Sequence, residues 1–294
     1  MNNHNIPTPA QFAAKIATYK TKRGAQNAAA ALVESMLKIY RVDTVKSYLT
    51  KYRKAAKAAG IIYINDYLKV PQSLSESRTA EKIGAQKKRL ESRRTVENPA
   101  AMVAAAVELL EAKSYLDRCL GLALLTGRRT IEVMKIGRIK AASPSLVIFE
   151  GQAKKNAAAL TNSAISRKST AENEPEIYAI PVLHNAEKLA AVWAELQAEK
   201  DFLGKHGADH EKTTRAYAKD LRMKCKARFS DYLESPKPHD LRKVYAQICY
   251  HTSQSPEVFA QDYVSKILGH EKEDTTTGRA YMEIVVKNTP RGLI

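Results

Sequence analysis

The sequence predicts a mainly α-helical protein of two unequal domains, with a small antiparallel β-sheet in the larger one. The chain has 294 residues, which is more than one typical domain requires. Apolar residues recur at helical spacing along most of it, and several of these stretches open on a capping residue followed by proline. Only two short segments have the character of strands.

Positive charge is concentrated in the N-terminal third of the chain. Overall, 48 Lys and Arg residues oppose 31 Asp and Glu residues, which gives a net charge of +17. Residues 1–95 hold 19 of the basic and six of the acidic residues, a net charge of +13. A surplus of this size favours a polyanion, so nucleic acid is the expected partner. A solvated basic face is the alternative that charge alone leaves open.

The composition excludes several classes of protein. With 44% hydrophobic and 27% charged residues, the chain is predicted to be neither a disordered tail nor a membrane protein. Residues 1–9 lack the basic end and apolar stretch of an export signal, so a cytoplasmic location is expected. Cys119, Cys225 and Cys249 form no pair at metal-binding spacing. Neither a metal ion nor another cofactor is expected.

Residues 1–70 are predicted to form a basic helical domain that binds DNA. Thr8 followed by Pro9 starts a helix that continues to residue 19, and a second helix follows over 24–40. Asp43 is expected to cap a third helix, which has one apolar face and ends near residue 60. Five basic residues occupy much of its remaining surface and are expected to face phosphates: Lys46, Lys51, Arg53, Lys54 and Lys57.

Residues 71–97 are predicted to be a basic linker that is helical in its middle. Large apolar residues are sparse there, while Lys87, Lys88 and Arg89 form a basic run that is expected to contact DNA. The larger domain, residues 98–294, begins where Asn98 and Pro99 repeat the combination of cap and proline.

The larger domain is predicted to be helical around one hairpin. A long Ala- and Leu-rich helical stretch runs from residue 98 to 125, with a break near Ser114. Strands are expected at 146–150 and 177–182, where they can pair as an antiparallel hairpin. Four helical patterns follow, at 187–200, 213–232, 239–251 and 256–268.

Residues 126–132 read Thr-Gly-Arg-Arg-Thr-Ile-Glu and follow a buried helix. The Arg129 guanidinium can clamp a phosphate through two parallel hydrogen bonds, and Glu132 can fix the start of the next helix. Taken alone, the segment is more typical of a helix C-terminus whose last carbonyls attract arginine than of a phosphate clamp.

Two further segments carry side chains suited to phosphate chemistry. Lys154 follows the first strand, where a lysine on a hairpin can reach a groove and give a proton to a departing alkoxide. His239 and Arg242 are three residues apart in the first turn of a helix, so both can converge on one phosphate. Lysines at a turn are usually solvated, and a histidine at a helix start is often incidental.

The last two segments are Leu-Gly-His at 268–270, which closes an apolar helix, and Tyr281, eleven residues after His270. A phenol can act as a nucleophile on phosphorus. A lone tyrosine is nevertheless more often a core residue or an interface anchor.

Together, the five segments resemble the tyrosine recombinase superfamily in order and in spacing. The superfamily pattern TGxRxxE matches Arg129 with Glu132, and its hairpin lysine, HxxR, LGH and tyrosine match single positions. These are Lys154, His239, Arg242, His270 and Tyr281. The resemblance covers residues 98–284 and implies a two-domain DNA clamp whose catalytic domain is like that of type IB topoisomerases. TGRRTIEV at 126–133 and FEGQAK at 149–154 look closer to telomere resolvases, also called protelomerases, than to phage integrases.

The resemblance also implies a reaction. Tyr281 would form a 3′-phosphotyrosine, Lys154 would be the general acid and His239 would assist. The non-bridging oxygens would be held by Arg129, Arg242 and His270. No cofactor would be needed, and a dimer on a palindromic double-stranded DNA site, at the nucleoid of a bacterial, phage or plasmid system, would form closed hairpin ends. Alternatives are an integrase that joins two duplexes, a type IB topoisomerase, and a non-catalytic architectural DNA-binding protein.

Overall fold

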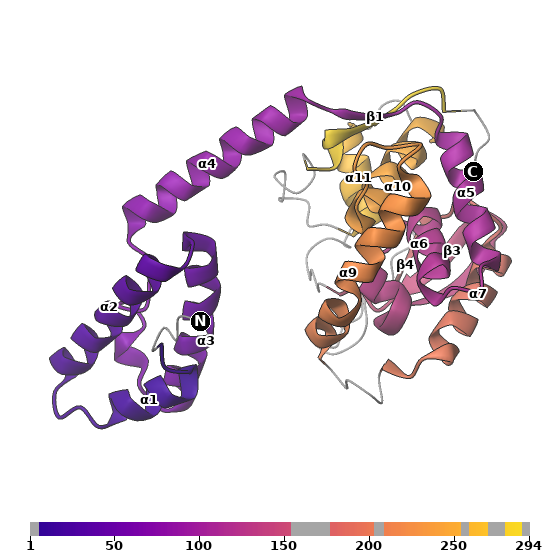
Figure 1. The fold of residues 1–294 in the computed structure, drawn as a ribbon. Helices are drawn as coiled ribbons and strands as arrows, with labels where there is room; N and C mark the ends of the chain where they lie inside the picture. Colours follow the sequence, from indigo (N-terminus) through magenta and orange to yellow (C-terminus); the bar gives the residue numbers. More distant parts are fainter. Residues whose placement is uncertain (1–5, 154–176, 203–208, 254–258, 270–279, 290–294) are drawn as a thin grey trace. The chain divides into compact units, whose positions relative to one another are not determined.

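The computed structural model of the chain describes residues 6–153, 177–202, 209–253, 259–269 and 280–289. The chain divides into two compact units, Met1–Lys88 and Arg89–Ile294 (Figure 1). Each unit has its own apolar core. The mainly helical fold with a small antiparallel sheet is confirmed. Among the described residues, no helix is long and apolar enough to cross a membrane.

The first unit is a helical bundle. Its elements are α1 (Pro9–Ala17), α2 (Lys22–Ile39), α3 (Val42–Ala58), the 3-10 turn η1 (Ile62–Ile64) and most of α4 (Gln72–Glu91). Thr8 caps α1 as predicted, because its hydroxyl accepts a hydrogen bond from the Gln11 N–H. The apolar faces of α1, α2 and α3 bury Ile16, Met36 and Leu49 together.

Asp43 does not cap α3, contrary to the prediction. The cap position is Arg41, and the Asp43 carboxylate instead binds two cations of α4. Arg78 Nε donates to it over 2.8 Å and Lys82 Nζ over 2.6 Å. These hydrogen bonds lower the pKa of Asp43 to about 2. Asp43 therefore fixes one helix against another, which is a long-range role that local capping rules do not anticipate.

Residues 71–97, the predicted linker, contain a helix in their middle, as expected, and a short strand. Most of this segment forms the single helix α4, and Arg94–Val96 form strand β1. This strand pairs in parallel with β5 (Ile284–Val286). The C-terminal end of the 71–97 segment therefore belongs to the larger unit. A three-residue strand offers too little alternation to be seen in the sequence.

The larger unit has six long helices in its described part and one three-stranded sheet. The helices are α5 (Pro99–Glu108), α6 (Tyr115–Thr126), α7 (Ala186–Glu199), α9 (His210–Phe229), α10 (Pro238–Thr252) and α11 (Ala260–Leu268). The strands β2 (Arg138–Ser143), β3 (Leu146–Glu150) and β4 (Ile177–Pro181) follow one another in an antiparallel sheet. The predicted pairing of β3 with β4 is confirmed, whereas β2 was not predicted. Short turns are η2 (Leu109–Glu111), the π-helical turn η3 (Glu132–Ile136) and η4 (Tyr281–Glu283).

Helices α6 and α10 lie against each other in the centre of the core and are buried along most of their length. The predicted break before α6 is confirmed, because the Ser114 hydroxyl caps this helix. Two of the predicted functional segments therefore leave from ends of buried helices: 126–132 from the end of α6, and 238–242 at the start of α10. Such rigid supports suit a site that must hold its side chains in place.

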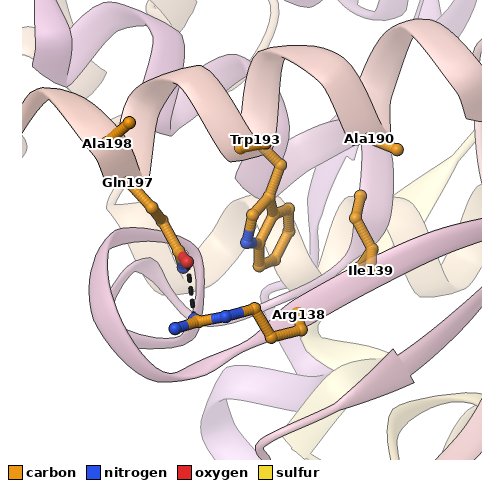
Figure 2. A pocket seen from close by; sticks show the side chains of 7 residues that line it. Arg138, Ile139, Ala190, Trp193, Gln197 and Ala198 are labelled. Atoms are coloured by element: carbon orange, nitrogen blue, oxygen red, sulfur yellow. Dashed lines mark hydrogen bonds between the residues drawn. The ribbon is translucent and has the colours of Figure 1, made fainter.

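The turn η3 is anchored to α7. Trp193 Nε1 and Gln197 Nε2 both donate to the Gly137 carbonyl, and Gln197 Nε2 also donates to the Val133 carbonyl. Figure 2 shows Gln197 and Trp193 projecting from α7 toward β2, with the bond from Arg138 to Gln197. The buried Glu132 therefore starts a turn whose far end is fixed by α7.

We predict that Gly127→Ala destabilises the larger unit. Gly127 has a left-handed φ of 65°, and an added Cβ would lie 2.1 Å from a ring carbon of Tyr245. The expected loss in the free energy of unfolding is at least about 1–3 kcal/mol. Gly84→Ala in α4 is the matched control, since nothing lies within 4 Å of its added Cβ. It should stabilise by roughly 0.5–1 kcal/mol. Urea unfolding measures both, and equal effects would contradict the prediction.

Candidate active site

Arg242 and Tyr281 lie in contact within the larger unit. Arg242 Nε donates to the Tyr281 hydroxyl over 3.2 Å, and both side chains are buried. The remaining nitrogens of Arg242 bind the ends of two helices: Nη1 donates to the Gly127 carbonyl over 2.5 Å and Nη2 to the Leu268 carbonyl over 2.7 Å. Three of the five N–H groups of a guanidinium have these partners among the described residues, so two can meet phosphate oxygens.

Glu132 holds Arg129 in place. Its carboxylate is fully buried and accepts hydrogen bonds from the Arg129 backbone N–H over 2.9 Å and from Arg129 Nη1 over 2.5 Å. Burial alone would raise the pKa of Glu132, but Arg242, Arg129 and Arg128 outweigh it and lower the pKa to about 2. Glu132 is therefore ionised, and it fixes the arginine rather than the start of a regular helix.

The adjacent arginines 128 and 129 have different environments. The Arg128 side chain is 1% exposed and donates to the carbonyls of Thr126 and Ile267 and to the hydroxyl of Tyr178. The Arg129 side chain is 19% exposed and reaches a groove. Both arginines line that groove, but Arg129 is the more exposed of the two, and Arg128 is held by three hydrogen bonds inside the protein.

His239 lies beside Tyr281, with the two ring centroids 5.9 Å apart. Burial and, after it, the neighbouring Arg242, Lys243 and Arg129 together lower the pKa of His239 to about 4 against the opposite effect of Asp240. The imidazole is therefore uncharged at neutral pH. It can exchange hydrogen bonds or accept a proton, but it does not add a positive charge.

A groove of about 680 Å³ joins these side chains to α9. Arg128, Arg129, His239 and Arg242 line it, and α9 contributes Lys219 and Arg222. The groove has cations from three separate stretches of chain. Such a concentration of positive charge can stabilise a phosphate whose charge grows during reaction.

Two predicted site residues, Lys154 and His270, lie outside the described residues. Their described neighbours in the sequence are Ala153 and Gly269. The Ala153 N–H donates to Glu132 over 3.1 Å. The residue directly before Lys154 is therefore bound to the carboxylate that holds Arg129.

The predicted DNA-contacting residues are distributed along α3 and α4. Lys51, Lys54, Lys57, Lys87 and Lys88 are exposed, and Arg53 is half-buried. Members of the set also make contacts within the protein: Lys46 Nζ donates to Ser75 over 2.6 Å, Arg53 Nη2 donates to the Thr50 hydroxyl over 3.2 Å, and Arg89 pairs with Glu283 at 3.4 Å.

Sequence reasoning missed the residues that surround the site from distant elements. Lys219 and Arg222 belong to a long basic helix without a motif, and Tyr178 resembles any strand tyrosine. Gln152 lies inside a segment that attracted attention only for its lysines. Among the residues that the structure describes, no three His, Cys, Asp or Glu side chains are grouped to hold a metal ion.

The model of the telomere resolvase ResT/TelK catalytic domain matches residues 92–283. The chain belongs to this family. The match includes every segment that forms the site, from Arg129 to Tyr281. No curated protein sequence has significant similarity to the chain.

Solved structures of telomere resolvases have the same fold. A variant of protelomerase TelA covalently complexed with substrate DNA is 25% identical, with a TM-score of 0.80 over 95% of this chain and 87% of that one. A second TelA variant, complexed with a DNA hairpin product, is 24% identical, with the same coverage and a TM-score of 0.79. Protelomerase TelK complexed with substrate DNA is 18% identical, with a TM-score of 0.63 over 98% of this chain and 53% of that one.

We predict a stability change that depends on His239. The pKa of His239 is about 4 in the folded telomere resolvase, against an ordinary value of 6.5. Between these values the unfolded chain binds the proton first, so stability falls as pH falls from 6.5 toward 4. His239→Gln removes this contribution, and urea unfolding across that range should show a smaller slope for the variant. Parallel pH dependences of the two proteins would contradict the shift.

Proposed function

We propose that this telomere resolvase cleaves and rejoins DNA through Tyr281 and closes DNA ends as hairpins. The observation that carries the proposal is the Tyr281 hydroxyl 3.2 Å from Arg242 Nε, beside a groove lined by Arg129 and His239. Family membership and the likeness to protelomerases complexed with DNA support it. The nucleophile and the charges that its target needs are thus in one place.

The proposed first step exchanges one phosphoester bond for another. The Tyr281 oxygen attacks the scissile phosphorus, a P–O bond forms to tyrosine, and the P–O5′ bond breaks. Lys154 gives its proton to the leaving 5′ oxygen. Arg129, Arg242 and His270 hold the non-bridging oxygens, whose negative charge increases in the pentacovalent transition state.

His239 is proposed to assist as a neutral group. An uncharged imidazole can accept the proton that the Tyr281 phenol loses, or it can hydrogen-bond to the phosphate. The low pKa of His239 keeps the imidazole neutral and able to accept, but it also makes the ring a weak base, which favours the hydrogen bond over full proton transfer.

The proposed second step reverses the first with a different alcohol. A 5′-hydroxyl attacks the phosphotyrosine, and the P–O bond to Tyr281 breaks. The covalent link retains the energy of the original bond, so neither ATP nor a metal ion is required. When the hydroxyl belongs to the opposite strand of the same duplex, the product is a closed hairpin. When it belongs to another duplex, the product is a recombinant, which is the integrase alternative.

Basic residues of the first unit and α4 are proposed to hold the duplex through its phosphates. The set comprises Lys46, Lys51, Arg53, Lys54, Lys57, Lys87, Lys88 and Arg89, most of which are exposed. Two copies related by a dyad are proposed to act on a palindromic site. Their proposed location is the nucleoid.

A labelled inverted-repeat DNA tests the proposed function. Wild-type protein should yield products that re-anneal at once after denaturation, because closed hairpins keep both strands joined. Tyr281→Phe should form no SDS-resistant adduct and no hairpin, while specific DNA binding stays within a few fold. Exchanged duplex arms would indicate an integrase, and cleavage by Tyr281→Phe would remove this residue from the mechanism.

Arg129→Ala and Arg128→Ala should fail in different ways. Arg129→Ala should fold normally and lose about 2.7–4 kcal/mol of transition-state stabilisation, as for a lost oxyanion donor. Arg128→Ala should lose on the order of 3–5 kcal/mol of folding stability, since it breaks a buried charged network. Thermal unfolding and single-turnover adduct formation measure the two effects. A stable but inactive Arg128→Ala together with an active Arg129→Ala would reverse the assignment.

A further inference from the structure

The three residues just before Lys154 each lie against a different part of the larger unit. Gly151 has a left-handed φ of 85°, and an added Cβ would lie 2.1 Å from the Ile136 carbonyl oxygen. The Ala153 N–H donates to the Glu132 carboxylate over 3.1 Å. Between them, the side chain of Gln152 is buried. Such fixation exceeds what a solvated hairpin loop requires.

Gln152 joins this segment to the end of α11. Its Nε2 donates to the Gly269 carbonyl over 2.8 Å, and its Oε1 accepts from the Tyr178 hydroxyl over 2.7 Å. Tyr178 in turn accepts from Arg128 Nη1 over 2.5 Å. Because the Tyr178 hydroxyl accepts from Arg128, its own proton is donated to Gln152, and only the amide oxygen Oε1 can accept it. This fixes the orientation of the amide group, with Nε2 directed to the Gly269 carbonyl.

Gly269 is the fixed end of this connection. It has a left-handed φ of 68°, and an added Cβ would lie 2.5 Å from Gln152 Oε1 and 2.8 Å from the Tyr178 hydroxyl. The two preceding carbonyls, of Ile267 and Leu268, accept from Arg128 and Arg242. The end of α11 should therefore stay in place without Gln152, whereas the segment before Lys154 loses its hydrogen bonds to Gly269 and Tyr178 and keeps the bond from Ala153 to Glu132.

We propose that Gln152 is a positioning residue, which places Lys154 for proton transfer by tying the segment before it to the Gly269 carbonyl. The proposal rests on the proposed function, in which Lys154 protonates the leaving 5′ oxygen. Gln152 itself touches neither DNA nor the reacting atoms in this assignment. Its loss should therefore impair leaving-group protonation more than phosphate binding.

A change of leaving group isolates this step. DNA in which sulfur replaces the bridging 5′ oxygen still forms the P–O bond to Tyr281, but the P–S bond breaks without a general acid. The reason is that a thiol has a pKa of about 8.5, far below the value near 16 of water. A thiolate leaves unaided, and single-turnover adduct formation can be compared for the oxygen and sulfur substrates.

Gln152→Met keeps the side-chain size and removes both hydrogen bonds. It should slow adduct formation on the oxygen substrate by about 10- to 100-fold, and on the sulfur substrate by no more than a few fold. Lys154→Ala should show the same pattern more strongly, at roughly 10²–10⁴-fold on the oxygen substrate. Arg129→Ala should be slow on both substrates, because sulfur does not replace its contact with the non-bridging oxygens.

Gln197→Met is the matched control. Gln197 also uses its amide to hold the turn that starts at Glu132, but its amide partners there are the carbonyls of Val133 and Gly137 rather than the 151–153 segment or Gly269. Any loss of activity in this variant should be equal for the two substrates. Gln152→Glu is a second test, since it keeps an acceptor for Tyr178 and loses the donor to Gly269, and it should behave as Gln152→Met does.

The possible failures are distinguishable. If sulfur does not rescue Lys154→Ala, the general-acid role in the proposed function is wrong, and the role of Gln152 is wrong with it. If sulfur rescues Lys154→Ala but the Gln152 variants are equally slow on both substrates, or fully active on both, only the positioning role is overturned. If neither Gln152 variant retains the wild-type thermal unfolding profile, Gln152 is a stability residue and the proposal also fails.

Discussion

The site depends on the burial of two guanidinium groups in one place. Arg128 and Arg242 are each 1% exposed, and charges removed from water must find partners inside the protein. Both donate to carbonyls at the C-terminal ends of α6 and α11, which carry partial negative charge, and the ionised Glu132 lies among them. Because each guanidinium takes hydrogen-bond acceptors from both helices, the ends of α6 and α11, which are far apart in sequence, lie close together.

This requirement explains why the functional residues converge. The helix ends that accept from Arg128 and Arg242 are the ones that lead into Arg129 and toward His270 in the sequence. Arg242 also meets the Tyr281 hydroxyl, so a single side chain connects the structural network to the nucleophile. The same hydrogen bonds therefore pair the buried charges of the fold and hold the site residues in place.

Local patterns predicted the helices well, because caps and periodicity are properties of neighbouring residues. Thr8 and Ser114 act as caps, and β3 pairs with β4 as expected. The failures involve partners that are distant in sequence. Asp43 binds α4 instead of capping its own helix, and Gln152 shows no signal because its partner Gly269 is 117 residues away. The adjacent arginines at 128 and 129 are the same residue type, and their different burial is seen only in the structure. The family pattern nevertheless identifies Arg129 as the catalytic candidate.

The pairing of β1 with β5 has a consequence for protein engineering. Strand β1 follows α4 directly, and β5 begins one residue after the turn that contains Tyr281. A chimera that exchanged the N-terminal unit at residue 97 would remove the strand that pairs with β5. It would also remove Arg94, whose ion pair with Asp240 anchors the first turn of α10. A catalytic domain intended for transfer should therefore begin near Arg89, which lies within residues 71–97, the predicted linker.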